Sequence, residues 1–331
     1  MGVTMRMQNR AVHILAALAM LAALAEDGTV LAQGYPSKPL RIVVGFPAGG
    51  PIDIVARLMA VKITEVMGQQ VVIDNRGGAN SMIGTEFDAK SAPDGYTMIL
   101  ASTGLAINPN LYPKMPYDTL RDLAPVTLVT STPELFVVHP SVPAKTMKDM
   151  IALAKARPGQ IIIASPGSGG LPHLALELLK TAARIDVIHV PYKGAAPAVT
   201  DLLGGQVSGL IADLPVLQPH IVSGRLRALA VASPKRSPLL PDVPTMTEQG
   251  LPSVEAINWY GALVAAKTPP EVIAKLRDAI VKSLNDTDLH EKLVSRGADP
   301  IPSTSEQFAA FLKNELAKWG RIVKESGAKI D

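Results

Sequence analysis

The stretch Leu40–Arg57, LRIVVGFPAGGPIDIVAR, predicts a strand, a tight glycine-rich loop and the start of a helix. Residues 40–46 are mostly β-branched or apolar, and residues 47–50 are turn-forming. From Pro51 to Met67 the apolar residues recur with a period of 3.6, which indicates an amphipathic helix. The loop therefore joins the carboxyl end of a strand to the amino end of a helix.

The same alternation of strand and helix patterns continues along the chain, which is typical of α/β layers with parallel strands. A length of 331 residues suits two lobes. We expect residues 34–133 plus 255–331 to form lobe 1, with lobe 2, residues 134–254, inserted between them. Capping-box patterns at 146–149, 268–271 and 303–306 predict helix starts. An apolar stripe near the end is expected to pack in the core, namely Phe308, Phe311, Leu312, Leu316 and Trp319.

The first 32 residues have the pattern of a signal peptide. Arg6 and Arg10 precede an apolar run, residues 11–25, that is too short for a transmembrane helix. Cleavage is predicted after Ala32, where small or apolar residues precede the bond; a site after Ala25 and an uncleaved membrane anchor are the alternatives. The mature protein is expected in the periplasm, free of further membrane spans.

The composition excludes several kinds of chemistry. There is no cysteine, so a lipid anchor on cysteine, a disulfide, a thiolate metal site and a cysteine nucleophile are all impossible. The net charge is +3, and cleavage does not change it because the segment removed holds two basic and two acidic residues. No block of like charge and no basic stripe occurs, so nucleic acid is not an expected partner.

Motifs for catalysis or cofactor binding are incomplete. In Gly167-Ser168-Gly169-Gly170, Pro172 replaces the last glycine of a dinucleotide fingerprint, and Pro166 replaces the first glycine of a nucleophile elbow. The five histidines of the predicted mature chain lack metal-ligand spacing: His139, His173, His189, His220 and His290. We therefore expect no cofactor, no metal and no catalytic residue. His173, in the first turn of a predicted helix, stays open as a functional candidate.

Glycine-rich strand-to-helix loops carry the functional signal. In open α/β sheets, ligands bind beyond the carboxyl ends of strands, where helix amino ends offer unpaired N–H groups and a positive dipole end. Glycine lets the main chain approach a ligand closely. The glycines concerned are Gly49, Gly50, Gly77, Gly78, Gly167, Gly169 and Gly170. Such loops favour an anion, although each taken alone is also compatible with a simple tight turn.

Five short segments in order give the chain a specific resemblance. They are GFPAGGPIDIVAR (45–57), DNRGGAN (74–80), APDGYT (92–97), VPYKG (190–194) and DVPT (242–245). Together, behind a signal peptide, they resemble the solute receptors of tripartite tricarboxylate transporters, the Bug receptors. The match spans nearly the whole mature chain.

The resemblance implies a type II periplasmic-binding fold whose two lobes close over the solute like a Venus flytrap. It implies that main-chain N–H groups and waters hold the solute's carboxylate, that Asp53 caps the helix after the first loop, and that the protein, expected to be a monomer, delivers its solute to a membrane permease. The implied ligand-binding residues are Phe46, Pro47, Ala48, Gly49, Gly50, Asn80, Ser81, Ser102, Thr103, Ser165, Gly167, Ser168, Gly169, Gly170, Tyr192, Lys193 and Asp213.

Three questions stay open at this level. Pro51 stands where the family has a small residue and removes one N–H donor from the presumed solute wall. The solute could be an aliphatic dicarboxylate, a tricarboxylate, an amino acid or an aromatic acid. The alternatives to a transport receptor are a periplasmic enzyme on a binding-protein fold and a solute sensor that feeds a two-component system.

Overall fold

The computed structural model describes residues 34–326, so the predicted signal peptide lies outside the described residues. Residues 34–37 belong to one compact unit, and the residues from Lys38 onward belong to another, which holds every helix and strand described below. Among these helices, none is both long enough and apolar enough to cross a bilayer.

Lobe 1 begins with the strand, loop and helix that the sequence predicts. Strand β1 (Leu40–Val44) leads through the glycine-rich loop into helix α3 (Pro51–Met67). β1 lies between β2 (Val71–Asn75) and β3 (Thr97–Ser102), and both pairings are parallel. The helices that follow β2 and β3 are α4 (Met82–Ala89) and α5 (Gly104–Leu111). The predicted α/β alternation is thus confirmed, and it places three strand-to-helix loops at the same edge of the sheet.

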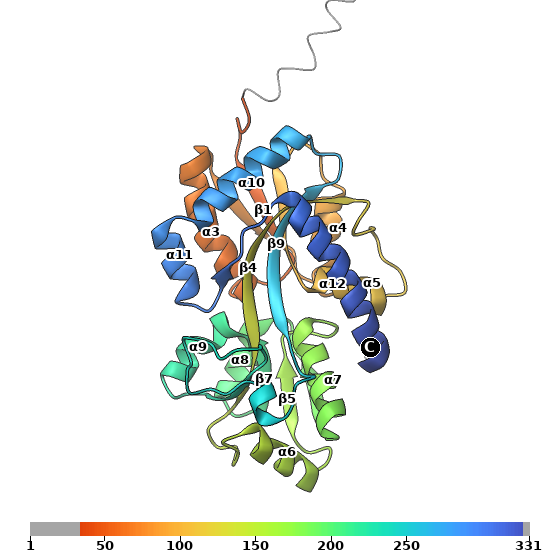
Figure 1. Ribbon diagram of the computed structural model, residues 1–331, viewed down its shortest axis with the longest axis vertical. Coiled ribbons are helices and arrows are strands. Elements are labelled where there is room, and N and C mark those ends of the chain that lie inside the picture. The colour runs from red at the N-terminus through yellow and green to blue at the C-terminus, as the bar shows by residue number, and fades with distance from the viewer. Residues whose placement is uncertain (1–33, 327–331) are drawn as a thin grey trace, which may run out of the picture. The chain divides into compact units, whose positions relative to one another are not determined.

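Strand β4 (Leu123–Val138) belongs to both lobes. Up to Pro133 it pairs antiparallel with β9 (Ile257–Ala265), and from Glu134 onward it pairs antiparallel with β7 (Gly209–Asp213). Figure 1 shows β4 and β9 running side by side between the two groups of helices. The strand order is β2-β1-β3-β9-β4-β7-β5-β6, with β8 and β10 also paired to β4. One continuous strand therefore connects the two lobes.

Lobe 2 repeats the α/β plan. Strand β5 (Ile162–Ser165) pairs in parallel with β6 (Ile188–Pro191) and with β7, so their carboxyl ends share one edge. Strand β8 (Arg227–Val231) pairs antiparallel with β4. The helices of this lobe are α6 (Met147–Ala156), α7 (Leu171–Ala183), α8 (Ala195–Leu203) and α9 (Leu214–Val222).

The end of the chain returns to lobe 1. After β9 come α10 (Pro270–Leu284), α11 (Thr287–Val294), the short β10 (Asp299–Pro300) and α12 (Ser305–Ser326). Helix α10 packs against α3, while α12 packs against α5 and β4 and also contacts α7. The lobe boundaries predicted at residues 134 and 255 stay a prediction.

Aromatic packing fixes α12 against β9. The Trp259 ring meets Phe308 edge to face with ring centroids 5.8 Å apart, and the indole N–H groups of Trp259 and Trp319 both donate to Glu315. Gly261 leaves room for this packing, since a Cβ there would lie 2.2 Å from the Phe308 ring. The predicted apolar stripe is therefore core packing, with Phe308, Leu312 and Trp319 fully buried.

Helix starts follow the capping prediction in one case of three. Thr146 and Asp149 form the predicted reciprocal box at α6. At α10 the prediction is wrong, because the N-cap is Pro269 and the Thr268 hydroxyl instead donates to the Ala265 carbonyl. At α12 the reciprocal bonds join Thr304 and Gln307, one residue later than predicted.

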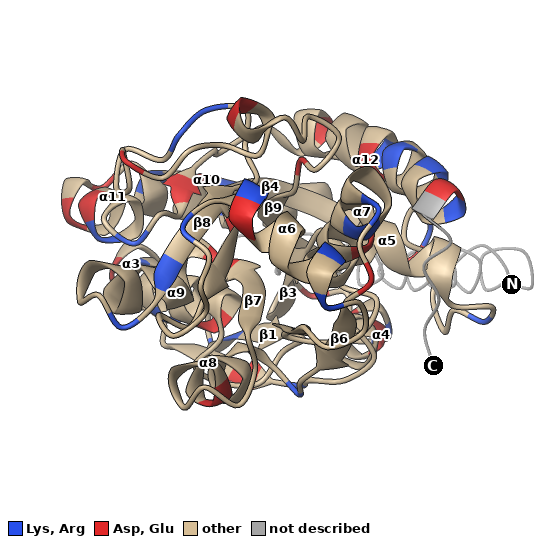
Figure 2. Cartoon of the chain, turned by 90° about the horizontal axis from the view of Figure 1, so that it is seen from below, with Lys and Arg blue, Asp and Glu red and all other residues tan. Residues whose placement is uncertain are grey.

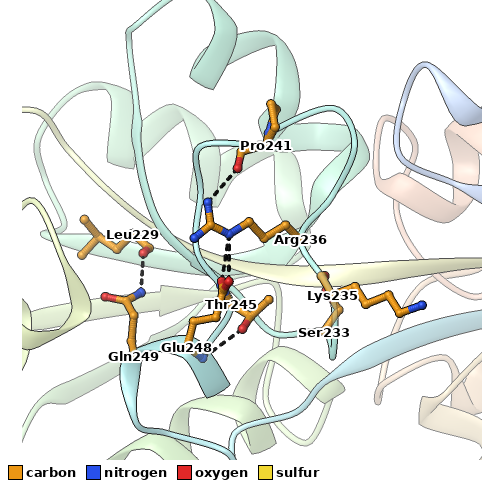
Figure 3. A network of polar contacts seen from close by, with 8 residues as sticks. All are labelled: Leu229, Ser233, Lys235, Arg236, Pro241, Thr245, Glu248 and Gln249. Carbon is orange, nitrogen blue, oxygen red and sulfur yellow. Dashed lines mark hydrogen bonds and ion pairs between the residues drawn. The ribbon is translucent and has the colours of Figure 1, made fainter.

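The segment DVPT (242–245) stabilises the connection between β8 and β9 (Figure 3). Thr245 and Glu248 exchange side-chain and backbone hydrogen bonds in the manner of a capping box. The Arg236 guanidinium donates to Glu248 and to the Pro241 carbonyl. Gln249 adds a bond to the Leu229 carbonyl. In this structure, therefore, the segment has a structural role.

Surface charges are mixed in sign. Figure 2 shows Lys and Arg interspersed with Asp and Glu over the elements visible from that side. Several ion pairs join exposed side chains, such as Lys90 with Glu86 and Lys292 with Asp288. Exposed pairs of this kind contribute about 0 to 1 kcal/mol each. The stability of the fold therefore rests on its buried cores.

Candidate functional site

A cavity of about 690 Å³ lies between the strand-to-helix loops of the two lobes. Lobe 1 contributes the loops after β1, β2 and β3, and lobe 2 contributes the loops after β5, β6 and β7. Twelve of the sequence-predicted ligand-binding residues line it: Phe46, Pro47, Gly50, Asn80, Ser81, Ser102, Gly167, Ser168, Gly170, Tyr192, Lys193 and Asp213. Pro51, Gly77 and Gly78 line it as well. The fold thus brings together segments that are far apart in the sequence.

Five predicted residues do not line the cavity: Ala48, Gly49, Thr103, Ser165 and Gly169. Four of these five, all except Ala48, hold the loops instead. Ala48 is exposed. The Gly49 N–H donates to Asp53, and the Gly169 N–H donates to His173 Nδ1 at 3.0 Å. The Thr103 hydroxyl donates to Asn258 Oδ1, and the Ser165 hydroxyl donates to the Gly167 carbonyl. Their polar groups are engaged within the protein.

Six helices begin at the edge of this cavity. Each contributes its N-cap residue to the lining or, for α5, the first helical residue: Gly50 for α3, Ser81 for α4, Gly104 for α5, Gly170 for α7, Gly194 for α8 and Asp213 for α9. The first N–H groups of a helix have no intrahelical acceptor, and the amino end carries a partial positive charge. The cavity therefore suits an anion, although Pro51 withholds one N–H donor at α3.

Asp53 holds the first loop, and the prediction that it caps α3 is wrong. The N-cap is Gly50, and Asp53 is the third residue of the helix. Its carboxylate accepts from the Gly49 N–H, from Arg57 Nε and from Asn75 Nδ2, each at 2.9 Å. Burial alone would raise the pKa of Asp53, but the bonds from Arg57, Gly49 and Asn75 together lower it. The carboxylate is thus ionised and ties the loop to the helix.

The loop after β2 is strained and closes against lobe 2. Ala79, Asn80 and Ser81 all have positive φ angles, of 46°, 50° and 72°, which side-chain-bearing residues adopt rarely. Asn80 Nδ2 donates to the carbonyl of Gly169 in lobe 2 at 3.0 Å and to Asn108 Oδ1 at 2.8 Å. Asn80 therefore joins the loop after β2 to the loop after β5.

Only two of the charged side chains in residues 34–326 line the cavity. Lys193 is exposed, whereas Asp213 is buried. Asp213 accepts hydrogen bonds from Asn258 Nδ2 at 3.0 Å and from the Tyr260 hydroxyl at 3.1 Å. Burial raises the pKa of Asp213 to about 6, although these bonds oppose the shift. Asn258 and Tyr260 also line the cavity and were not predicted; a polar asparagine in the otherwise apolar strand β9 is the signal that could have identified the first.

A serine–histidine contact lies beneath the lobe 2 loop. Ser165 Oγ is 2.7 Å from His189 Nε2, and the rings of His173 and His189 are stacked with centroids 4.2 Å apart. Burial, together with the charges of His173 and Lys180, lowers the pKa of His189 to about 4, so it is neutral near pH 7. Within residues 34–326, no group of three or more His, Asp or Glu is placed to hold a metal ion.

Comparison with known proteins gives consistent matches. The profile described as "Tripartite tricarboxylate transporter family receptor" matches residues 55–328. Protein BugT of Bordetella pertussis is 41% identical over 305 residues, which cover 91% of this chain and 93% of BugT.

Two solved structures extend the likeness to the fold. The periplasmic binding protein BugD is 34% identical, with a TM-score of 0.85 over 89% of this chain and 99% of BugD. The R. palustris protein Rpa4515, solved with adipate, is also 34% identical, with a TM-score of 0.86 over 89% of this chain and 100% of that protein.

Replacing Asp53 tests how the first loop is held. Asp53→Asn replaces one acceptor oxygen by an NH₂ group, which faces other N–H donors and cannot accept their hydrogen bonds. At pH 7 the free energy of unfolding should therefore fall by about 2 kcal/mol. Because the folded-state pKa is lowered, this stabilisation is present above the ordinary value of 3.8 and is lost as the pH falls through the folded-state pKa. Urea unfolding at pH 7 and at pH 3, followed by circular dichroism, measures both effects.

Asp278→Asn is the matched control, because Asp278 pairs with Arg277 on the surface and its side chain is 68% exposed. Its unfolding free energy should change by less than about 0.5 kcal/mol. Equal stability of Asp53→Asn and the wild type at pH 7 would show that the loop does not depend on this carboxylate.

Proposed function

The chain belongs to the tripartite tricarboxylate transporter family of receptors, and we propose that it captures a small carboxylate-bearing solute in the cavity between its lobes and delivers it to a membrane permease. The observation that carries the proposal is the convergence of six helix amino ends on one cavity, five of which have an uncharged N-cap residue. Such ends bind carboxylates without a cationic side chain. The adipate bound to the relative Rpa4515 is a solute of this class.

The solute's carboxylate is held chiefly by main-chain N–H groups and by bridging waters. Lys193 has the only cationic side chain among the lining residues of the described chain, and it lies at the solvent-exposed rim. A cation in that position is screened by water and contributes little. The glycines that line the cavity, by contrast, allow close approach of the backbone, as Gly167 illustrates: a Cβ there would meet nothing nearer than 3.7 Å in the protein.

Capture requires the lobes to open and close. We assign lobe 1 to residues 34–133 plus 255–331 and lobe 2 to residues 134–254, so that opening bends the long strands β4 and β9. The bond from Asn80 to the Gly169 carbonyl joins loops of the two lobes and has to break when they separate. Its geometry supports a receptor that is stabilised when closed over solute.

The alternative of an enzyme rests on the contact between Ser165 and His189, and the burial of the serine argues against it. Ser165 Oγ lies 2.7 Å from His189 Nε2 and 2.8 Å from the Gly167 carbonyl oxygen. Ser165 is fully buried and does not line the cavity, so its oxygen is not presented to a solute there. The pair supports the loop.

Absence of turnover is the first expectation. We would incubate the carboxylate that binds most tightly with a saturating concentration of the mature protein. Mass spectrometry should then find the solute unchanged. Ser165→Ala serves as the comparison, because any genuine reaction that uses this hydroxyl would disappear in it. Conversion by the wild type that Ser165→Ala abolishes would establish an enzyme.

Export is the second expectation. We propose that residues 1–32 are removed and that the mature receptor acts as a monomer in the periplasm, where the binding protein BugD is also found. Amino-terminal sequencing of the protein from a periplasmic fraction should give Gln33. A chain that keeps Met1 and sediments with membranes would instead show that residues 11–25 are an anchor.

The third expectation concerns how the carboxylate is held. Gly167→Val places a branched side chain where the solute approaches the main chain, although a Cβ fits the fold there, so affinity should fall by at least about tenfold. Lys193→Ala removes a solvent-exposed cationic side chain and should weaken binding by no more than about fivefold. Calorimetric titration with the tightest ligand from a panel of succinate, glutarate, adipate, citrate and L-glutamate measures both.

Circular dichroism confirms that both variants are folded, and titrations at low and high salt add a control, since binding by N–H groups inside a cavity should depend weakly on ionic strength. If Lys193→Ala abolishes binding while folded Gly167→Val binds normally, a side-chain charge holds the carboxylate and the proposed binding mode is wrong.

A further inference from the structure

Two carboxyl groups face each other at the point where β4 changes sheets. Glu134 is the first residue of β4 that pairs with β7, and its partner in the register is Asp213, the last residue of β7. Directly opposed residues of antiparallel strands place their side chains on the same face. Glu134 is 0% exposed and Asp213 is 5% exposed, and Asp213 lines the cavity. The cavity floor therefore contains a buried acidic pair.

No cationic side chain of residues 34–326 forms an ion pair with either acid. The donors to Asp213 are neutral: the Asn258 amide, the Tyr260 hydroxyl and the protonated form of the Glu134 carboxyl that faces it. No other residue of the described chain donates a hydrogen bond to the Glu134 carboxyl group. A buried acid is costly unless it is paired or protonated. Apart from the partial positive charge at the amino end of α9, of which Asp213 is the N-cap, the described residues thus offer this carboxylate no cationic partner.

The two acids share one negative charge. Two carboxyl groups that face each other inside a protein do not both ionise, so one proton stays with the pair. Burial and then the nearby Asp213 raise the pKa of Glu134 well above its usual value. Burial also raises the pKa of Asp213, to about 6, while bonds from Asn258, Glu134 and Tyr260 oppose that shift. Because these donors surround Asp213, the charge of the pair lies on the Asp213 side, which lines the cavity.

The location of this charge restricts the solute. A carboxylate placed against Asp213 would be repelled, whereas the helix amino ends Gly50, Gly170 and Gly194 attract a carboxylate elsewhere in the same cavity. A hydroxyl group could donate a hydrogen bond to Asp213 but would leave its charge uncompensated. A protonated amine supplies both the donors and the opposite charge.

We propose that the solute is an amino acid or another amine-bearing carboxylate, whose ammonium group pairs with Asp213 while its carboxylate lies at the helix amino ends. This inference rests on the proposed receptor function and narrows its solute class. Glu134 acts as a neutral positioning residue behind Asp213, and Asn258 and Tyr260 orient the Asp213 carboxylate.

Matched probes that differ only in the amine test the proposal. We would titrate succinate against L-aspartate, glutarate against L-glutamate, and pentanoate against 5-aminopentanoate at pH 7.5, with L-malate as the hydroxyl-bearing member of the first set. In at least one set the amine-bearing probe should bind the wild type at least about tenfold more tightly than its amine-free partner. The hydroxyl-bearing malate should fall between succinate and aspartate.

Two variants locate the preference. Asp213→Asn keeps the shape and an acceptor oxygen for Asn258 but removes the charge, so the preference for the amine should fall by about tenfold. Glu134→Gln replaces an already neutral group and should retain the preference. Circular dichroism checks that both variants are folded. If one is not folded, the comparison of matched probes on the wild-type protein still tests the proposal.

The outcomes separate the two proposals. Tighter binding of the amine-free acid in every set, or an unchanged preference in folded Asp213→Asn, overturns the amine-bearing solute class but leaves a carboxylate receptor. Absence of binding by any probe, with or without an amine, at millimolar concentration contradicts both the receptor function proposed above and this inference.

Discussion

The structure depends on one strand that has to serve two sheets. Because β4 pairs with β9 up to Pro133 and with β7 from Glu134, the sheets of the two lobes are joined by an unbroken backbone. The parallel strands of each lobe then end towards the same cavity, and the helices that follow them begin there. The continuity of β4 therefore determines that loops from both lobes surround a single cavity.

Unpaired backbone groups make this cavity suitable for an anion, and side chains away from the ligand keep the backbone in place. Asp53 ties the first loop to α3, Ser165 ties the lobe 2 loop to the strand beneath it, and Asn80 bridges the lobes. The three consecutive positive φ angles at residues 79–81 are offset by these bonds. Each loop is thus held in position by hydrogen bonds within the protein.

Sequence reasoning located the loops better than the individual contacts. The pattern around Pro47–Gly50 predicted a strand-to-helix loop, and the loop is there, but the Gly49 N–H donates to Asp53. Thr103 was expected to bind the solute, yet its hydroxyl donates to Asn258. Asn258 and Tyr260 were missed because they lie in a strand that returns from lobe 2, more than 40 residues beyond Asp213, and no local pattern indicates that pairing.

The sequence by itself determined the α/β alternation, the glycine-rich loops and the likeness to a receptor family, because periodicity, turn residues and short motifs are local properties of the chain. The tertiary structure alone decided which N–H groups stay available, which hydroxyl groups bond inward, and that Glu134 faces Asp213 at the cavity floor. These outcomes depend on how strands far apart in the sequence pair with one another. The residues of one strand do not reveal which residues of a distant strand will lie opposite them.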